Sequence, residues 1–397
     1  MLQFPRPPRE GLFACLLILV GNICVSSLIP LMSYYIVDHL EKPAWMVSVY
    51  VGLVAVLSMM LNRAFGEKLD RSAPVRTFLT ASILAFIVYS GLLAVNGSYW
   101  LLLVAGVPLM SIANTANGVA FTFGRLLATE RGYDVARMNS WLRMSVSLAW
   151  MIGPAAAFSL VALSGFPATF TVSAGIGIFW FLLMIITVPK QFRAPAKNPG
   201  ADESGKDTPQ IWIAAATVTL FVITNVLYLS AMPLYFIKEV GLAEFAPGLS
   251  VSVKCFVEIF AIFGSVWLAR RIQAPTVLMI SAALSVLTMM LFAQVETLSG
   301  VLFIAVLDGL YYGIVAGIAL TFIQSFAPDR PGRATAVYMN SLFLGSMIGQ
   351  VSMGFIADAF DFRTVVYCAA AAGFAALLML LATRAVTART SARVPSI

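Results

Sequence analysis

The sequence predicts an all-α integral membrane protein in which twelve transmembrane helices form two six-helix bundles. Hydrophobic residues make up 60% of the 397 residues, charged residues make up only 11%, and the mean hydropathy is +0.91. A soluble domain typically carries about 25% charged residues. The composition therefore excludes a soluble enzyme or nucleic-acid-binding domain, and the net charge of +7 has to be interpreted relative to a membrane.

Apolar runs of transmembrane length occur twelve times along the chain. Crossing a hydrocarbon core of about 30 Å takes about 20 helical residues. The runs of the first half are 11–37, 43–62, 75–95, 99–124, 138–163 and 167–189. The runs of the second half are 210–237, 247–269, 274–293, 298–326, 333–357 and 364–383. Each run predicts one membrane-spanning helix.

One long polar stretch lies between these two sets of runs. Its sequence, KQFRAPAKNPGADESGKDTPQ (190–210), is rich in proline, glycine and charge, which is typical of a flexible linker. We therefore expect an N-terminal bundle over 1–189, a linker over 190–209 and a C-terminal bundle over 210–397.

Basic residues are distributed unevenly between the two sides of the predicted membrane. The two tails, the connections after the second, fourth, sixth, eighth and tenth runs, and the ends of the runs beside them hold 21 of the 25 lysines and arginines. Loops that carry an excess of lysine and arginine stay in the cytoplasm. The pattern predicts that both termini and the linker are cytoplasmic.

Three segments of the first half recur in the second half at offsets near 200 residues. The pairs are AFTFGRLLATER (120–131) with ALTFIQSFAPDR (319–330), RMNSWL (137–142) with YMNSLF (338–343), and IPLMSYY (29–35) with MPLYFIK (232–238). Polar residues match in register, which chance similarity between apolar helices does not explain. A repeat in the same orientation is typical of transporters whose halves rock about a site near the midplane.

The loop after the second run carries a partial signature. With the twelve runs and the repeat, GEKLDRSAPVRT (66–77) resembles the major facilitator superfamily, whose loop reads roughly G-x-x-x-D-R-x-G-R-[RK]. Gly66, Asp70, Arg71 and Arg76 match, but Ser-Ala-Pro stands where a glycine is expected. The resemblance implies the major facilitator fold and a loop that braces a cytoplasmic gate. The alternative is a loop whose basic residues only set orientation.

Further segments in both halves are similar to the bacterial sugar efflux transporter family. They are SIANTAN (111–117), SLAWMIGP (147–154), NVLYLSAMPLY (225–235), and GIVAGI (313–318) followed by FIQSFAPDRPGRATAVYMNS (322–341). The resemblance implies a transporter of the bacterial cytoplasmic (inner) membrane that exports sugars or sugar-like compounds in exchange for protons. In that family an acidic residue can precede the Met-Pro-Leu that follows Ala231 here. If that acid carries protons in the relatives, the coupling site of this chain is moved or lost.

Three ionisable residues lie deep within apolar runs, and these are Lys254, Glu258 and Asp308. A charge at the centre of a membrane helix costs about 3 kcal/mol on insertion scales and usually marks a functional site. At about 1.5 Å per residue, both carboxylates lie about 15–17 Å from the periplasmic ends of their helices, near the midplane. We predict that Glu258 and Asp308 take part in proton coupling.

Lys254 and Glu258 are four residues apart, so they share a helix face with Ala261 and Ser265. A carboxylate that burial and a nearby cation affect in opposite directions can bind and release protons. The spacing therefore predicts a coupling site in which Lys254 balances the charge of Glu258. The alternative is a permanent buried ion pair that only fixes helix packing.

Asp308 adjoins a series of small residues at Ala305, Gly309, Gly313 and Gly317. Small residues at every fourth position allow two membrane helices to pack closely. We expect this face to lie against a neighbouring helix. Asp308 then either reaches the transport cavity or is satisfied by that neighbour.

Polar and aromatic residues within the runs offer the groups that a sugar requires. Amides hydrogen-bond to hydroxyls, and aromatic rings cover the apolar C–H faces of a sugar. The predicted solute-binding residues are Asn22, Asn114, Asn117, Trp150, Asn225, Tyr228 and Asn340. For each asparagine the alternative is a hydrogen bond between helices. The predicted gating residues, near cytoplasmic helix ends, are Asp70, Arg71, Arg143, Arg330 and Arg333.

These observations predict a secondary active transporter that exports sugars or sugar-like compounds by proton antiport with alternating access. The alternatives are a multidrug or other small-molecule proton antiporter of the same fold, and a non-transporting membrane sensor. The chain has one histidine (His39) and no Walker loop, so we expect no enzymatic activity, cofactor, metal site or nucleic-acid partner. The expected partners are a small polar solute, protons and the lipid bilayer, and we expect a monomer.

Overall fold

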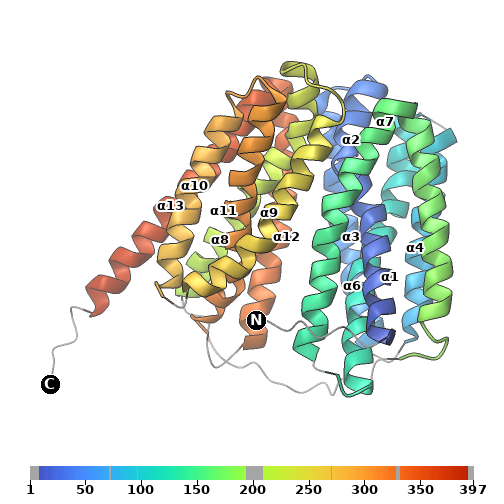
Figure 1. The fold of residues 1–397 in the computed structure, drawn as a ribbon, viewed down its shortest axis with the longest axis horizontal. Coiled ribbons are helices and arrows are strands. Elements are labelled where there is room, and N and C mark those ends of the chain that lie inside the picture. The colour runs from blue at the N-terminus through green and yellow to red at the C-terminus, as the bar shows by residue number, and fades with distance from the viewer. Residues whose placement is uncertain are drawn as a thin grey trace. The chain divides into compact units, whose positions relative to one another are not determined.

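The computed structural model describes residues 9–70, 73–95, 97–133, 135–193, 209–269, 271–327 and 331–391 (Figure 1). Within these ranges the chain is helical apart from short connections, so the predicted all-α class is confirmed. The first half contains α1 (Arg9–Leu28), α2 (Leu31–Tyr34), η1 (Tyr35–His39), α3 (Ala44–Asp70), α4 (Val75–Val95), α5 (Tyr99–Leu101), η2 (Leu102–Gly106), α6 (Val107–Glu130) and α7 (Val135–Thr187). The second half contains α8 (Pro209–Leu234), η3 (Tyr235–Glu239), α9 (Ala246–Ala269), α10 (Ala274–Phe292), α11 (Leu298–Gln324), α12 (Pro331–Ala359) and α13 (Phe362–Ser391). The η segments are π-helical turns.

Helix α7 is longer than one membrane crossing requires. The described ranges contain eleven helices long and apolar enough to cross a bilayer, and one of them, Trp141–Thr187, has 47 residues. At about 1.5 Å per residue it would measure about 70 Å, more than twice a hydrocarbon core of about 30 Å. The chain turns at Gly165 (φ 75°, ψ 176°), and Figure 1 shows α7 as two antiparallel arms. The eleven helices therefore provide the twelve predicted crossings.

Contacts divide the chain into two units. The N-terminal unit comprises Met1–Lys42, Val49–Gly200 and Pro247–Ser252, and the C-terminal unit comprises Pro43–Ser48, Ala201–Ala246 and Val253–Ile397. Each unit therefore contains most of one half of the sequence and a short segment from the other half.

In the N-terminal unit, α1 packs against both arms of α7 through glycine. Gly21 lies against the indole of Trp180 and Gly153 lies against the hydroxyl of Ser26, and a Cβ at either glycine would overlap its neighbour. Trp180 is buried and also meets Phe86 of α4 edge-on, with 6.4 Å between the ring centroids. Small residues at helix contacts allow the close packing on which helix association in lipid depends.

In the C-terminal unit, the series of small residues in α11 packs against α9. A Cβ on Gly313 would lie 2.6 Å from the Cβ of Ala261 and 2.8 Å from the carbonyl oxygen of Glu258. A Cβ on Gly309 would lie closer still to the carbonyl oxygen of Lys254. The helix that packs against the small residues of α11 is therefore α9, which the sequence alone did not identify. The contact includes Lys254 and Glu258, the two charged residues of α9.

The same irregular backbone occurs in each half, 200 residues apart. After η1 and after η3, the N–H of the next residue, Leu40 or Val240, donates to the first carbonyl of the π segment at 3.0 Å. One residue further, φ is positive at Glu41 (51°) and at Gly241 (76°). The two π segments are 200 residues apart, which is three less than the separation of Pro30 and Pro233 in the matched Pro-Leu pairs. The proline therefore stands closer to the π segment in the second half.

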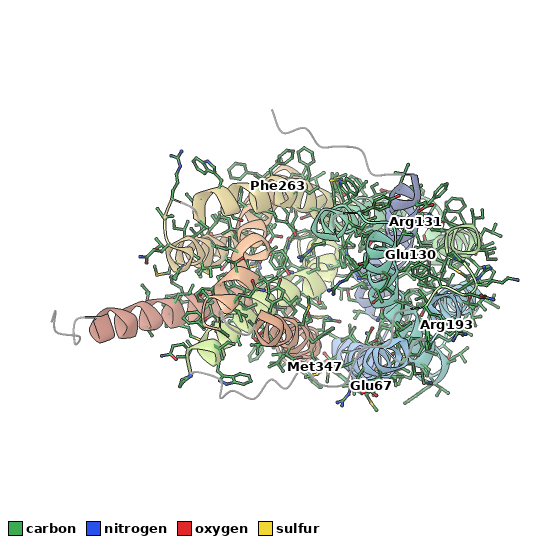
Figure 2. The ribbon with its side chains drawn as sticks, turned by 90° about the horizontal axis from the view of Figure 1, so that it is seen from below. Glu67, Glu130, Arg131, Arg193, Phe263 and Met347 are labelled. Carbon is green, nitrogen blue, oxygen red and sulfur yellow. The ribbon has the colours of Figure 1, made fainter. Side chains whose placement is uncertain are left out.

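Helix α9 has two chemically different faces. Four aromatic side chains on one face are 54–62% exposed, namely Phe256, Phe260, Phe263 and Trp267. Figure 2 shows Phe263 directed away from the neighbouring helices. The predicted polar face, which begins at Lys254 and Glu258, is displaced by two residues, or about 200° at 3.6 residues per turn. The aromatic face therefore turns toward lipid while the charged face packs against α11.

Candidate functional site

The most polar site in the interior of the C-terminal unit is built around the ammonium group of Lys254. Its Nζ lies 3.0 Å from Oδ1 of Asp308 and donates a hydrogen bond to Oδ1 of Asn225. The ring of Tyr312 lies beneath it, with the centroid 5.0 Å from Nζ. The side chains of Lys254 and Asp308 are only 6% and 1% exposed. Helices α8, α9 and α11 therefore each contribute to a single desolvated charge cluster.

The packing of α9 against α11 explains the choice of ion-pair partner. Because Gly309 allows the α11 backbone to reach the carbonyl of Lys254, the neighbouring Asp308 comes directly beside the ammonium group. The ion pair of the structure joins Lys254 to Asp308 rather than to Glu258, and a balancing role of Lys254 for Glu258 stays a prediction. A spacing of four residues places two side chains on one face, but here a closer carboxylate comes from the facing helix.

Glu258 lies one helical turn beyond this ion pair and is half-buried. Its backbone lies against Gly313 of α11. Within the described part of the chain, its carboxylate forms no hydrogen bond or ion pair. Among the described residues, the two predicted coupling acids therefore have different environments: Asp308 is in an ion pair, and Glu258 has no hydrogen bond or ion pair.

The other predicted residues of the C-terminal unit are not all in this cluster. Asn225 belongs to it, and its carbonyl oxygen is occupied by Lys254. Tyr228 is 1% exposed and stacks on Phe292, with 4.4 Å between the ring centroids. Asn340 is exposed on α12. Contact with a solute at these three positions stays a prediction.

In the N-terminal unit, three of the predicted asparagines join helices through neutral hydrogen bonds. Nδ2 of Asn22 donates to the carbonyl of Ile18 at 2.9 Å and to Oδ1 of Asn117 at 3.2 Å. Nδ2 of Asn114 donates to Oγ of Ser58 at 3.2 Å. Asn22 is buried, Asn114 is half-buried and Asn117 is exposed. The structure therefore brings Asn22 and Asn117 together and links α6 to α3. Trp150, also in this unit, is half-buried on α7.

Sequence reasoning missed two polar residues on α3. Ser58 accepts the bond from Asn114, and Oδ1 of Asn62 would lie 3.5 Å from a Cβ on Gly118 of α6. A signal for Ser58 was present, because it precedes Glu258 by 200 residues, the offset of the internal repeat. The repeat could therefore have indicated that both positions face the fourth long helix of their half.

The predicted gating residues are only partly described. Arg71 and Arg330 lie outside the described residues, as do the side chains of Asp70 and Arg333. Arg143 is exposed on α7. These five residues therefore stay a prediction. Among the residues that the structure describes, no group of three or more histidine, cysteine, aspartate or glutamate side chains could hold a metal ion.

Comparison with known families identifies the fold that this geometry builds. The family model described as Major Facilitator Superfamily matches residues 11–349. This chain belongs to the major facilitator superfamily. It is therefore a multi-pass membrane transporter, and the prediction of a transporter rather than an enzyme is confirmed.

This major facilitator is similar to bacterial sugar efflux transporters over nearly its whole length. It is 26% identical to Sugar efflux transporter A of Dickeya chrysanthemi over 362 residues, which cover 90% of this chain and 89% of the relative. It is 25% identical to Sugar efflux transporter A of Escherichia coli (strain K12) over 374 residues, covering 93% and 95%. It is 26% identical to Sugar efflux transporter B of Salmonella typhimurium over 364 residues, covering 91% and 90%. The resemblance predicted from the short segments is confirmed.

Solved structures share the fold at lower sequence identity. The nucleoside transporter NupG matches with a TM-score of 0.74 and 16% identity, covering 94% of this chain and 99% of that one. A bacterial homologue of the human lysosomal transporter Spinster, in an inward-facing and occupied conformation, matches with a TM-score of 0.76 and 12% identity, covering 96% and 98%. The predicted major facilitator fold is confirmed.

Proposed function

We propose that this major facilitator exports sugars or sugar-like compounds in exchange for protons, by alternating access, across a bacterial cytoplasmic membrane. The observation that carries the solute class is the similarity to sugar efflux transporters A and B across about nine-tenths of both chains. The excess of lysine and arginine in alternate connections supports an orientation with both termini in the cytoplasm.

The chemistry of the N-terminal unit supports a neutral, hydroxyl-rich solute. Asn114 and Asn117 are at least partly accessible on α6, and amides donate and accept the hydrogen bonds that adjacent sugar hydroxyls require. In their present arrangement Asn22 donates a hydrogen bond to Asn117, so an arriving hydroxyl would exchange one neutral hydrogen bond for another. Such exchanges favour a polar uncharged solute because they leave no buried charge behind.

The chemistry of the C-terminal unit supports exchange with protons. Lys254, Glu258 and Asp308 place one cation and two acids within a helical bundle, where intramembrane ionisable groups mark ion and proton pathways. A carboxyl group that meets alternating water access can bind a proton on one side of the membrane and release it on the other. The bundles over 1–189 and 210–397, joined by the linker over 190–209, would provide the two moving parts.

The gate is proposed to lie on the cytoplasmic side. Its proposed members are Asp70, Arg71, Arg143, Arg330 and Arg333. Charged side chains at helix ends can form and break contacts between parts of a protein as access alternates, without remaining in the hydrocarbon.

Transport by the purified full-length protein in liposomes tests the proposal. Liposomes with an imposed pH gradient would be given radiolabelled glucose, galactose, lactose or sucrose, with protein-free liposomes as the control. Gradient-driven accumulation of at least one sugar is expected, and a protonophore should abolish it. Movement of none of these sugars would contradict the solute class. Gradient-driven movement of lipophilic drugs alone would instead support a multidrug antiporter.

A further inference from the structure

We propose that Glu258 alone carries the exchanged proton, whereas Asp308 is the fixed counter-ion of Lys254 and Asn225 is the positioning residue that keeps Lys254 directed toward Asp308. This inference rests on the proton exchange of the proposed function. It assigns different roles to Glu258 and Asp308, which the sequence analysis predicts to act alike in proton coupling.

Asp308 is placed as a permanent counter-ion. Its side chain is 1% exposed, and its Oδ1 lies 3.0 Å from Nζ of Lys254, which is itself buried. A proton bound to Asp308 would leave the ammonium group as a buried cation without a counter-ion, which is strongly unfavourable. Asp308 therefore keeps its negative charge while Lys254 remains beside it.

Glu258 is placed as an exchangeable acid. It is half-buried and has no hydrogen-bond or ion-pair partner in the described part of the chain. The backbone of Glu258 lies against Gly313 of α11, which has no side chain that could donate to the carboxylate. Binding a proton at Glu258 therefore breaks no bond and strands no charge.

Asn225 and Tyr312 determine which acid Lys254 meets. The amide oxygen of Asn225 accepts a hydrogen bond from Nζ on the α8 side, and the ring of Tyr312 lies 5.0 Å from Nζ. An amide oxygen and an aromatic face both attract a cation without bearing a charge. Together they hold the ammonium group at Asp308 and away from Glu258, one turn further along α9.

Few charged or titratable groups face Glu258. Lys254 and Cys255 share its helix, whereas Asp308 and Tyr312 face it from α11. Tyr338 of α12 interacts with Tyr312 in turn. Among the described residues, α8 contributes the neutral Asn225 and the buried Tyr228, which interacts with Tyr311.

Lys254 and Asp308 carry opposite charges, so their effects on Glu258 oppose each other. In each cycle one periplasmic proton bonds to a carboxylate oxygen of Glu258 and later leaves that oxygen toward the cytoplasm. Nothing is oxidised or reduced.

Two transport measurements in liposomes test whether Glu258 carries the proton and Asp308 is only the counter-ion of Lys254. With the panel sugar that the wild type accumulates best, Glu258→Gln should lose gradient-driven accumulation to the level of protein-free liposomes. It should still exchange labelled for unlabelled sugar at equal pH, since that exchange needs no proton. The double variant Lys254→Met/Asp308→Asn, which removes the ion pair without leaving a charge, should keep accumulation at a reduced rate. Accumulation by Glu258→Gln, or its absence in a folded double variant, would overturn the proposal.

Infrared difference spectroscopy supplies a readout that needs no sugar. On acidification the purified wild type should gain a protonated-carboxyl band that Glu258→Gln lacks and that the double variant retains. A band lost in the double variant and kept in Glu258→Gln would assign the proton to Asp308. If the wild type moves no sugar but shows the Glu258 band, the proposed function fails and this inference stands. If the wild type accumulates sugar but Glu258→Gln keeps the same carboxyl band, the proposed function stands and this inference fails.

The pH profile of accumulation tests the role of Asn225. Asn225→Ala should free Lys254 to approach Glu258, and a closer cation favours the charged carboxylate. The half-maximal pH should then shift to lower values. Asn225→Asp should keep Lys254 in place and add a negative charge, which favours the protonated acid and shifts the profile to higher pH. Unchanged profiles in both variants would show that Asn225 does not position Lys254.

Discussion

The contact between the second and fourth long helices of each half can be compared directly, because the two halves repeat. In the N-terminal unit, α3 and α6 are joined by neutral groups, with Asn114 donating to Ser58 at 3.2 Å. In the C-terminal unit, α9 carries Glu258 at the position 200 residues after Ser58, and α11 presents Gly313 there. One half therefore satisfies its polar group, whereas the acid of the other half has no hydrogen bond or ion pair within the residues that the structure describes.

This difference shows how a repeated scaffold can separate two tasks. A hydrogen bond between neutral groups holds two helices together at any pH, whereas an unpartnered acid can respond to protons. Val54 precedes Lys254 by the same 200 residues and has no charge, so the ion pair also belongs to one half alone. Both halves bring this pair of helices into contact, and the chemistry at the contact differs between them.

Removing the counter-ion should produce the largest effect of any single change. Asp308→Asn leaves the buried ammonium group of Lys254 without its partner, and breaking a buried pair in this way typically costs about 3–5 kcal/mol. We expect a large loss of thermal stability of the detergent-purified protein, measured by the melting of tryptophan fluorescence. Lys254→Met in the same chain should restore most of it. A double variant as unstable as Asp308→Asn alone would contradict the ion-pair explanation.

The glycine contact of the C-terminal unit should tolerate no side chain. In Gly313→Ala the new Cβ would lie 2.6 Å from the Cβ of Ala261 and 2.8 Å from the carbonyl oxygen of Glu258. Overpacking of this kind costs about 1–3 kcal/mol, so melting should occur at lower temperature.

Gly264→Ala on α9 is the matched control, because a Cβ there meets nothing within 4 Å. Equal melting temperatures for the two variants would mean that α9 and α11 are not held closely by glycine.

Two carboxylates cap the start of α13. The hydroxyl and N–H of Thr364 donate to the carboxylate of Asp361 and lower its pKa. Oxygens of Glu239 accept from the N–H groups of Phe362 and Arg363 at 2.6 and 3.0 Å. Asp361→Ala should therefore cost about 1 kcal/mol, as the loss of a helix cap does.

The contribution of Asp361 should depend on pH with a definite sign. Because its pKa is lower in the folded protein, the stabilisation is fully present above the ordinary carboxyl range near pH ~3.9. It disappears as the pH falls through the lowered value. The melting difference between the wild type and Asp361→Ala should therefore vanish in acid. A difference that grows on acidification would exclude the cap.

Breaking the neutral contact of the N-terminal unit should have the smallest effect. Asn114→Ala removes the bond to Ser58, and hydrogen bonds between membrane helices contribute about 0.6 kcal/mol on average. A double-mutant cycle with Ser58→Ala, read by thermal unfolding, should return a coupling energy of that order. A coupling energy as large as that of Lys254 and Asp308 would contradict the view that the neutral contact of the N-terminal unit is the weaker of the two.

Much of the fold could be predicted from the sequence because lipid imposes simple rules. Twelve apolar runs, one polar linker and a repeat near 200 residues follow from the length and polarity of segments. The continuity of α7 through Gly165 could not be predicted, because hydrophobicity does not report whether two helices are joined. The partner of Lys254 could not be predicted either, since spacing along one helix gives no information about the facing helix. Yet the small residues of α11 already indicated that such a helix lies close to Asp308.

The two faces of α9 restrict how this helix can move during a transport cycle. Rolling about its own axis would carry Lys254 or Glu258 toward the hydrocarbon, where a charge costs about 3 kcal/mol. It would also draw Phe256 and its aromatic neighbours away from lipid. Tilting or sliding with α11 carries no such penalty, because the same side chains keep the same surroundings. We therefore expect α9 to tilt or slide during the transport cycle but not to rotate about its own axis.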